Sequence, residues 1–267
     1  MNHPSIFITF IFALFSSYST GDEEALQLKS SSEDEVRGCY KHNQTLAVCF
    51  DVKKGSIKIQ KSSGEGIVYY RELGPEMFLY QVLDKAFITG RGASMIYVPD
   101  DVPRTPEALR AFSNDIQVDD EYESPESVYQ AALRELHRMP ELRLLERVSS
   151  ALADNTTRLK ILEPFHGLCL NLLKAADVEI PDELRAEPDQ NDRDKRCSRP
   201  TANNCRGMCG PGCSCWKWYC GDCCWHRGCY EHDLCCKKSR FSSYCLTPPG
   251  CSSFSGYPKC LRSSGWK

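Results

Sequence analysis

The sequence predicts an α+β amino-terminal domain followed by a small, disulfide-rich, mainly α module at the carboxyl end. Cysteine usage is the first indication, because 14 of the 17 cysteines lie in the 71 residues from Cys197 to Lys267. Charge is the second: this segment carries ten basic and three acidic residues, a net of +7, so the first 196 residues carry −10 of the chain's total of −3. The third is a change from strand-like alternation to helical periodicity within residues 35–180.

The first 20 residues have the pattern of a signal peptide. The apolar run Ile6–Phe15 is too short to span a bilayer and precedes small residues, which places cleavage near Ser19 or Gly21. We therefore expect a secreted, extracellular protein. Glycosylation sequons at Asn43 and Asn155 fit that route.

Residues 21–196 read as an acidic α+β domain or propeptide. Alternating apolar residues predict a hairpin from Leu46–Val52 and Ser56–Gln60, with Ile67–Glu72 as a third strand. Helical periodicity or capping predicts helices at Pro75–Phe87, after Thr105 and after Ser124, at Pro140–Leu152 and at Leu159–Leu173. No nucleotide-binding loop or repeat is found here, so we expect a folding or inhibitory leader.

Three cysteines belong to this amino-terminal domain. Cys39 precedes the first predicted strand and Cys49 lies within it, and a bridge between the two is the expected arrangement. Cys169 then has no partner among these three cysteines. It could form a disulfide with another chain or stay buried as a free thiol.

A polar, Pro-containing stretch with a dibasic site separates the two units. Arg193-Asp194-Lys195-Arg196 matches the pattern read by secretory proprotein convertases, and cleavage after Arg196 would release residues 197–267. The alternative is a solvated charge run. A released basic module would be attracted to anionic lipid or to polyanions.

Fourteen cysteines in a 71-residue module predict up to seven disulfides, because so short a chain buries too little apolar surface without cross-links. The rival interpretation is zinc. Cysteine and histidine recur about every three residues, at Cys220, Cys223, His226, Cys229, His232 and Cys235. An intracellular zinc module would require the signal peptide to be false, and secretion favours disulfides.

The segment Cys229–Cys235 has helical spacing, with Cys229, His232 and Cys236 on one side. Disulfides at both ends would hold His232 where it can act as a general base, and Asp233 would point to a neighbouring face where a hard cation can bind. The alternative is a structural pair, with the histidine bonded to a carbonyl and the aspartate solvated.

These residues resemble the secreted phospholipases A2, whose signature is Cys-x-x-His-Asp-x-Cys after a calcium loop Cys-Gly-x-Gly. Cys209-Gly210-Pro211-Gly212 is similar to that loop, and the resemblance covers about residues 205–236. It implies one Ca²⁺ ion bound by the carbonyls of Met208, Gly210 and Gly212 and by the Asp233 carboxylate.

The resemblance also implies a Cys209–Cys229 disulfide and a catalytic role for His232. In the family the histidine takes a proton from water, while Ca²⁺ and the loop amide, here that of Gly210, stabilise the oxyanion at the sn-2 ester. Three positions depart from the family: Gly228 replaces the first of two adjacent cysteines, Cys236 replaces an aromatic residue, and no Asp or Glu follows Asp233 to orient the histidine.

Aromatic residues in the module suggest a lipid interface. Trp216, Trp218 and Trp225 are interleaved with Lys217 and Arg227, a combination suited to a phospholipid membrane surface, although filling a small core is the alternative.

A non-enzymatic toxin, antimicrobial module or cystine-knot ligand for a cell-surface receptor is the competing function. Cys205–Cys209 matches the ring element of cystine-knot growth factors, but the tail Leu261–Lys267 lacks their closing Cys-x-Cys. We expect no nucleic-acid partner in either case.

Overall fold

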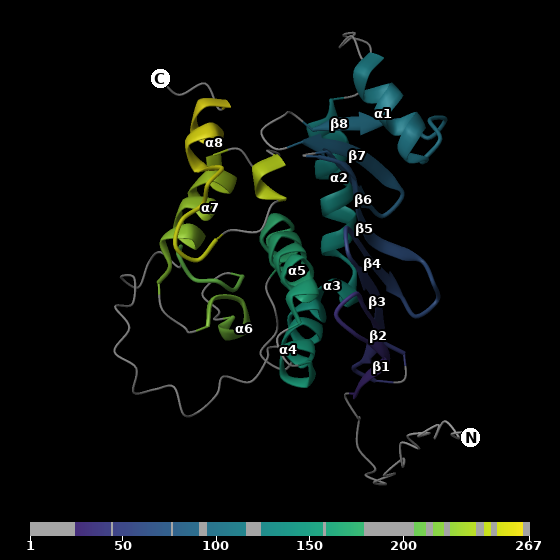
Figure 1. Ribbon diagram of the computed structural model, residues 1–267, viewed down its shortest axis with the longest axis vertical. Helices are drawn as coiled ribbons and strands as arrows, with labels where there is room; N and C mark the ends of the chain where they lie inside the picture. Colours follow the sequence, from purple (N-terminus) through teal and green to yellow (C-terminus); the bar gives the residue numbers. More distant parts are fainter. Residues whose placement is uncertain are drawn as a thin grey trace, which may run out of the picture.

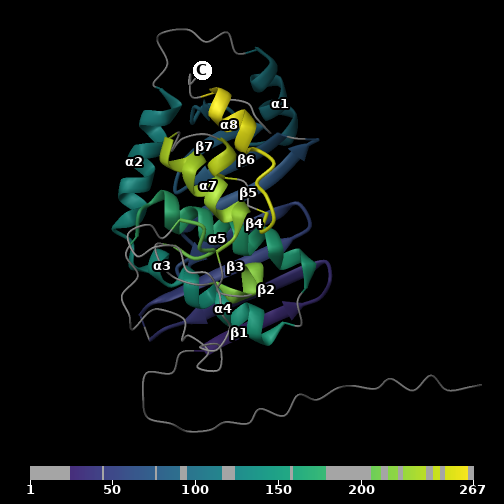
Figure 2. The ribbon, with the colours of Figure 1, turned by 90° about the vertical axis from the view of Figure 1, so that its left-hand side faces the viewer.

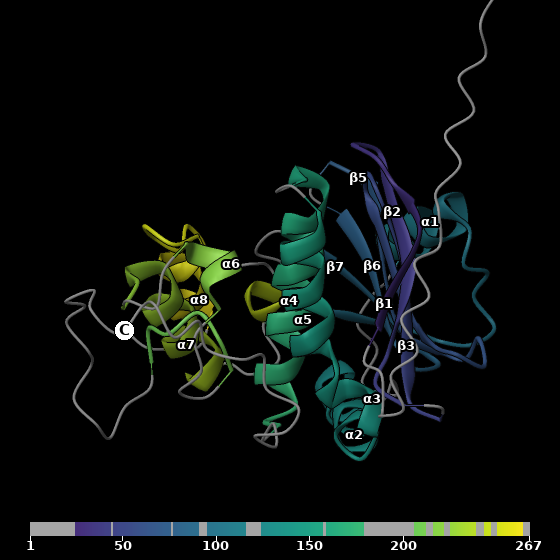
Figure 3. The ribbon, with the colours of Figure 1, turned by 90° about the horizontal axis from the view of Figure 1, so that it is seen from below.

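The chain is arranged in three layers, with a sheet on one side, helices in the middle and the cysteine-rich module on the other side (Figures 1 and 3). The structure is a computed structural model. It describes residues 25–43, 45–75, 77–90, 95–115, 124–156, 159–178, 206–211, 216–221, 225–238, 243–246 and 250–263. The predicted signal peptide and the predicted processing residues Arg193, Lys195 and Arg196 lie outside these ranges, as does Gly212 of the predicted calcium loop.

An antiparallel meander of eight strands forms the sheet, and each strand pairs with the next along the chain. The strands are β1 (Ala25–Ser31), β2 (Glu35–Lys41), β3 (Ala47–Lys53), β4 (Ser56–Lys61), β5 (Gly66–Gly74), β6 (Met77–Val82), β7 (Lys85–Gly90) and β8 (Ile96–Val98). β3, β4 and β5 confirm the three strands expected from alternation. Cys39 lies directly opposite Cys49 in the β2–β3 register, and the two are joined by the expected disulfide.

The predicted helix at Pro75–Phe87 is wrong. These residues form β6, a tight turn at Leu83–Asp84 and β7. Both faces of the sheet are covered at this point, since Leu79 packs toward α1 (Pro106–Asp115) while Tyr80 packs toward α2 (Pro125–His137). A strand buried on both faces has apolar residues at nearly every position, and periodicity cannot distinguish it from a buried helix.

Four further helical segments cover the same face of the sheet as α2. They are α3 (Pro140–Arg143), α4 (Leu145–Asn155), the 3₁₀ helix η1 (Lys160–Leu162) and α5 (Glu163–Ala175). Helix α1 begins at the predicted cap, where the Thr105 hydroxyl accepts the Ala108 N–H at 3.3 Å. Ser124 stands at the N-cap of α2, but its hydroxyl bonds Glu126 instead of the helix backbone.

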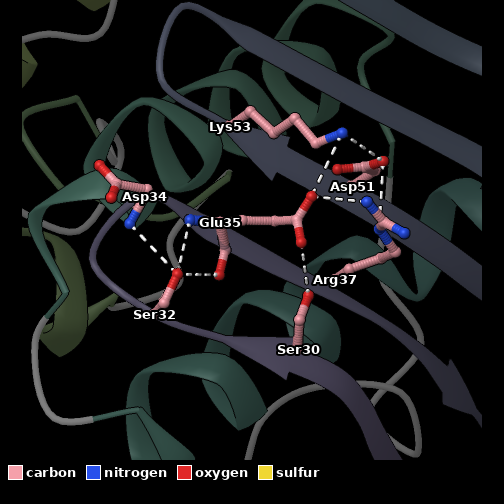
Figure 4. A network of polar contacts seen from close by, with 7 residues as sticks. All are labelled: Ser30, Ser32, Asp34, Glu35, Arg37, Asp51 and Lys53. Atoms are coloured by element: carbon pink, nitrogen blue, oxygen red, sulfur yellow. Dashed lines mark hydrogen bonds and ion pairs between the residues drawn. The ribbon is translucent and has the colours of Figure 1, made fainter.

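A polar network lies on the face of β1–β3 that is turned away from helices α2–α5 (Figure 4). Glu35 lies 3.2 Å from Lys53 and 3.1 Å from Ser30, and Arg37 lies 3.3 Å from Asp51. The hydrogen bond from Lys53 is the main reason that the pKa of Glu35 falls below its ordinary value. Such exposed pairs add little to the stability of the fold.

The module contributes α6 (Lys217–Cys220), α7 (Arg227–Lys238), the 3₁₀ helix η4 (Ser243–Cys245) and α8 (Tyr257–Ser263). Its disulfides among the described residues are Cys209–Cys229, Cys220–Cys251, Cys235–Cys260 and Cys236–Cys245. The carboxyl-terminal region is therefore disulfide-rich, as expected, which is typical of secreted and extracellular proteins. Within the described ranges, no helix combines the length and apolar character needed to cross a membrane.

Helix α5 forms the centre of the molecule. Its residues Phe165–Leu173 are all buried, because the sheet lies on one side of the helix and the module on the other (Figures 2 and 3). A helix that is apolar on every side requires cover on every side. Cys169 is a free, buried thiol on this helix, and burial raises its pKa.

Candidate active site

Helix α7 carries both His232 and Asp233, and disulfides hold it at both ends. Cys229 in its first turn is bonded to Cys209, which is the pairing that the phospholipase resemblance implies. Toward its other end, Cys235 is bonded to Cys260 and Cys236 to Cys245. The loop beginning at Cys209 is thereby fixed against the helix that presents the two polar side chains.

Gly228 departs from the family pattern for a steric reason. A Cβ at this position would lie 1.3 Å from the carbonyl oxygen of Gly250, so no side chain fits without moving the backbone. The Gly228 N–H donates to the Cys251 carbonyl at 3.3 Å, and Cys251 is bonded to Cys220. The backbone of Gly250 and Ser253 thus fills the space that a side chain at position 228 would need.

Asp233 is the most constrained polar side chain of the site. Its Oδ2 accepts the Gly207 N–H at 2.9 Å, and its Oδ1 lies 2.7 Å from Nζ of Lys174 in α5. Gly207 has a φ of +93° and packs so closely against Trp225 that a Cβ would come within 2.3 Å of the ring. Glycine thus permits the backbone approach that fixes the carboxylate.

Lys174 places a positive charge between two groups that were predicted to bind Ca²⁺. Its Nζ donates to the Met208 carbonyl at 3.3 Å as well as to the Asp233 carboxylate. Both charged side chains are largely buried, with exposed fractions of 16% and 13%. Lys174 was not predicted from the sequence, although it is the one charged residue in the mainly apolar stretch Leu168–Ala176.

His232 is only 1% exposed. Its ring meets Phe254 edge to face, with centroids 5.0 Å apart, and its Nε2 lies 3.7 Å from the disulfide sulfur of Cys236. Glu231 holds Phe254 in place, because its Oε2 accepts the Phe254 N–H at 3.0 Å. That bond, with help from Arg227, lowers the pKa of Glu231. The Glu231 carboxylate thus positions the Phe254 ring, against which the His232 imidazole packs.

Trp216 and Trp218 dock the module onto α4. Trp216 is fully buried and donates through Nε1 to Glu146 at 3.1 Å, and Trp218 donates to the Ser149 hydroxyl at 3.1 Å. The two indole rings stack with centroids 5.1 Å apart. In the uncleaved chain these two predicted lipid-facing rings therefore contact the amino-terminal domain. The third, Trp225, is 39% exposed.

A buried Ser149–His166 pair lies beneath this contact. The hydroxyl oxygen of Ser149 is 2.6 Å from Nδ1 of His166, so the hydroxyl can receive the Trp218 N–H and give its own hydrogen to the imidazole. Burial lowers the pKa of His166 from 6.5 to about 4. His166 therefore stays neutral at physiological pH.

We predict that the uncleaved chain loses stability as the pH falls from 6.5 toward 4. The unfolded histidine takes up a proton in this range while the folded one resists it, and the total loss is about 3 kcal/mol. Urea unfolding at several pH values measures this loss. A His166→Gln variant removes the titrating group and should show a flatter profile. An unchanged slope in the variant would assign the effect to other groups.

The predicted glycosylation sites differ in their surroundings. Asn155 is exposed and donates to the Ala151 carbonyl at 2.8 Å. Asn43 forms a local turn in which its Oδ1 accepts the N–H groups of Thr45 and Leu46 at 2.9 and 2.7 Å.

In two clusters of the described residues, the possible ligand atoms lie close enough together to hold a metal ion. One cluster is Cys209, Cys220 and His226, and the other is Cys235, Cys236 and Cys245. Each of these cysteines is in a disulfide. Metal binding by cysteine requires the thiolate, so the bonded sulfurs do not serve as zinc ligands. The Asp233 carboxylate and the Met208 carbonyl are oxygen donors of the kind that hard cations prefer.

No protein-family model, curated protein or solved structure matches this chain.

Proposed function

We propose that the chain is the secreted precursor of a calcium-dependent, phospholipase A2-like enzyme. Cleavage after Arg196 would release residues 197–267, a mainly α module that hydrolyses the sn-2 ester of phospholipids. One observation carries this proposal: the Asp233 carboxylate and the Met208 carbonyl converge on a single cation, and the residue before Asp233 is a histidine on a disulfide-anchored helix.

The residues fit a calcium ion. Asp233 supplies a carboxylate whose second oxygen is fixed by the Gly207 amide, and Met208 supplies a carbonyl. Gly210 lies in the same loop and is buried, which suits a backbone that faces an ion. The Lys174 ammonium shows that a positive charge is stable at this position. Met208, Gly210, Gly212 and Asp233 are the groups that would hold Ca²⁺.

His232 is the proposed general base. Its imidazole would take the proton from a water molecule as that water attacks the ester carbonyl, and would return it to the leaving alkoxide. The backbone amide of Gly210 would donate to the oxyanion. When bound, Ca²⁺ supplies Lewis-acid polarisation of the same carbonyl.

Glu231 and Phe254 provide support for His232 in place of the family's later aspartate. Phe254 packs edge to face on the imidazole, and its N–H is held by Glu231. Packing restricts the ring's orientation but does not supply the counter-charge that a carboxylate gives to an imidazolium. We therefore expect slower turnover than an enzyme with a His–Asp pair.

The uncleaved precursor would be latent. His232 is 1% exposed, and Trp216 and Trp218, which are suited to a membrane surface, pack against α4. The acidic amino-terminal domain also offsets the +7 charge of the module. Separation of the two parts would expose a basic, aromatic surface to anionic phospholipid.

Fatty-acid release from mixed phosphatidylcholine and phosphatidylglycerol vesicles tests the proposal. The secreted chain is assayed before and after convertase cleavage, with both fragments kept in the reaction, in Ca²⁺ or in a chelator. We expect release only from the cleaved chain in Ca²⁺. Equal release in the chelator would reject calcium dependence, and no release under any condition would reject the enzyme.

A non-enzymatic module that binds membranes or a cell-surface receptor is the second candidate. The sequence favours it at one point, because no Asp or Glu follows Asp233 and the family's supporting carboxylate is missing. Vesicle binding by the cleaved chain without any fatty-acid release would support this alternative.

A further inference from the structure

Lys174 contacts both the Met208 carbonyl and the Asp233 carboxylate, two groups that we assign to the calcium site. Its Nζ lies 2.7 Å from Asp233 Oδ1 and 3.3 Å from the Met208 carbonyl oxygen. We propose that Lys174 is a built-in cation through which the amino-terminal domain closes the calcium site of the uncleaved chain, so that Ca²⁺ and Lys174 compete for it. This inference rests on the proposed function, because it takes the site to be a calcium site.

Simultaneous occupation of the site by both cations is unfavourable. Ca²⁺ requires six to eight oxygen ligands at about 2.3–2.6 Å, including the carboxylate oxygen that Lys174 now contacts. An ammonium group within hydrogen-bonding distance of that oxygen would also repel the ion, and it would do so strongly because the two side chains are largely buried. Entry of Ca²⁺ therefore requires Lys174 to leave.

Lys174 is held in place by the end of α5. The Val178 N–H donates to the Leu173 carbonyl at 3.2 Å, and the Asp177 N–H donates to the Lys174 carbonyl at 3.3 Å, with Asp177 at a φ of +52°. This is the Schellman pattern of a fixed helix end. The ammonium is thus presented from a fixed helix end, directly after the buried stretch Phe165–Leu173.

The other hydrogen bonds between the module and the amino-terminal domain hold Asp233 next to Lys174. Trp216 bonds Glu146 and Trp218 bonds Ser149, so the module sits on α4 while Asp233 meets Lys174 on the adjacent α5. Among the described cysteines, no disulfide joins the amino-terminal domain to the module. Cleavage at Arg196 would therefore let the module move away from α5. The calcium site would then no longer contact Lys174.

Competition implies reciprocity between docking and ion binding. If docking onto α5 weakens Ca²⁺ binding, then Ca²⁺ must weaken docking by the same factor. The precursor would resist calcium while the linker keeps the module close to Lys174, and after cleavage the ion would favour separation. Activation would then require both the protease and Ca²⁺.

Calorimetric titration of the uncleaved full chain with Ca²⁺ tests the competition directly. We expect Lys174→Met to bind one Ca²⁺ at least about tenfold more tightly than wild type, in the range of ordinary coupling between sites. The double variant Lys174→Met/Asp233→Asn should lose this binding. Lys160→Met, at an exposed lysine in η1, is the matched control and should behave as wild type.

Equal Ca²⁺ affinity in wild type and Lys174→Met would overturn the proposal, as would tight binding that survives in the double variant. Lys174→Gln keeps a hydrogen-bond donor at the position without charge, and it replaces Lys174→Met if near-ultraviolet circular dichroism shows that the methionine variant does not fold. The readout is ion binding and not hydrolysis. Tighter binding by Lys174→Met in a chain that releases no fatty acid after cleavage would support the inference and reject the enzyme.

Discussion

Replacement of His232 by glutamine is expected to reduce calcium-dependent fatty-acid release from the cleaved chain by about 10²–10⁴-fold, the usual contribution of a general base. Glutamine is close to histidine in size and keeps polar atoms in the space between Phe254 and Cys236, but it cannot take a proton from water. Calcium binding should be unchanged, because the proposed ligands are the Asp233 carboxylate and the backbone carbonyls of Met208, Gly210 and Gly212.

His226→Gln is the matched control for this experiment. His226 lies in the same module, just before α7, and its backbone carbonyl accepts the Tyr230 N–H at 3.0 Å. We assign its side chain no part in catalysis, so the control should keep the wild-type rate within a few-fold. Wild-type activity in a folded His232→Gln protein would remove His232 from the reaction.

Replacement of Trp216 by alanine is expected to lower the free energy of unfolding of the uncleaved chain by about 3–5 kcal/mol, the typical cost of truncating a buried aromatic residue. Trp216 is fully buried, and it packs in the same core cluster as Leu145 and Val148 of α4. The change leaves a cavity at the contact between the module and the helices, and it removes the N–H that donates to Glu146.

Urea unfolding of Trp216→Ala and Trp216→Phe separates the two contributions. Phenylalanine keeps most of the ring and loses the N–H, so it should cost about 1–3 kcal/mol through the weakened pairing of Glu146. Trp225→Ala, at a side chain that is 39% exposed, should cost clearly less than Trp216→Ala. Equal effects at Trp216 and Trp225 would argue against a buried docking contact.

The sequence was sufficient for much of the amino-terminal domain. Alternation identified β3, β4 and β5, and the prolines after Thr105 and Ser124 marked the starts of α1 and α2. It did not indicate β1, β2 or β8, and it failed at β6 and β7, where burial on both faces of the sheet removes the alternation that marks a strand. Cys39 and Cys49 are joined as expected, although the β2–β3 pairing that places them opposite each other was not predicted.

The site was only half predictable, for a physical reason. The motif around His232 and Asp233 is local, so its helix could be anticipated from the spacing, while the Cys209–Cys229 disulfide was implied by the resemblance to the phospholipases A2. Lys174 lies 59 residues before Asp233, and nothing local in either segment indicates that the two will meet. The docking bonds of Trp216 and Trp218 to α4 span a similar distance in sequence, about 70 residues, and they depend on how two units pack.

We assign the Met208 carbonyl and the Asp233 carboxylate to a calcium site. Calorimetric titration of the cleaved chain with Ca²⁺, with both fragments present, tests this assignment. We predict that the wild-type protein binds one Ca²⁺ ion per module and that Asp233→Asn, which removes the carboxylate charge but keeps its shape, abolishes this binding. Absence of Ca²⁺ binding in the folded, cleaved wild-type protein, or undiminished binding by Asp233→Asn, would contradict the claim.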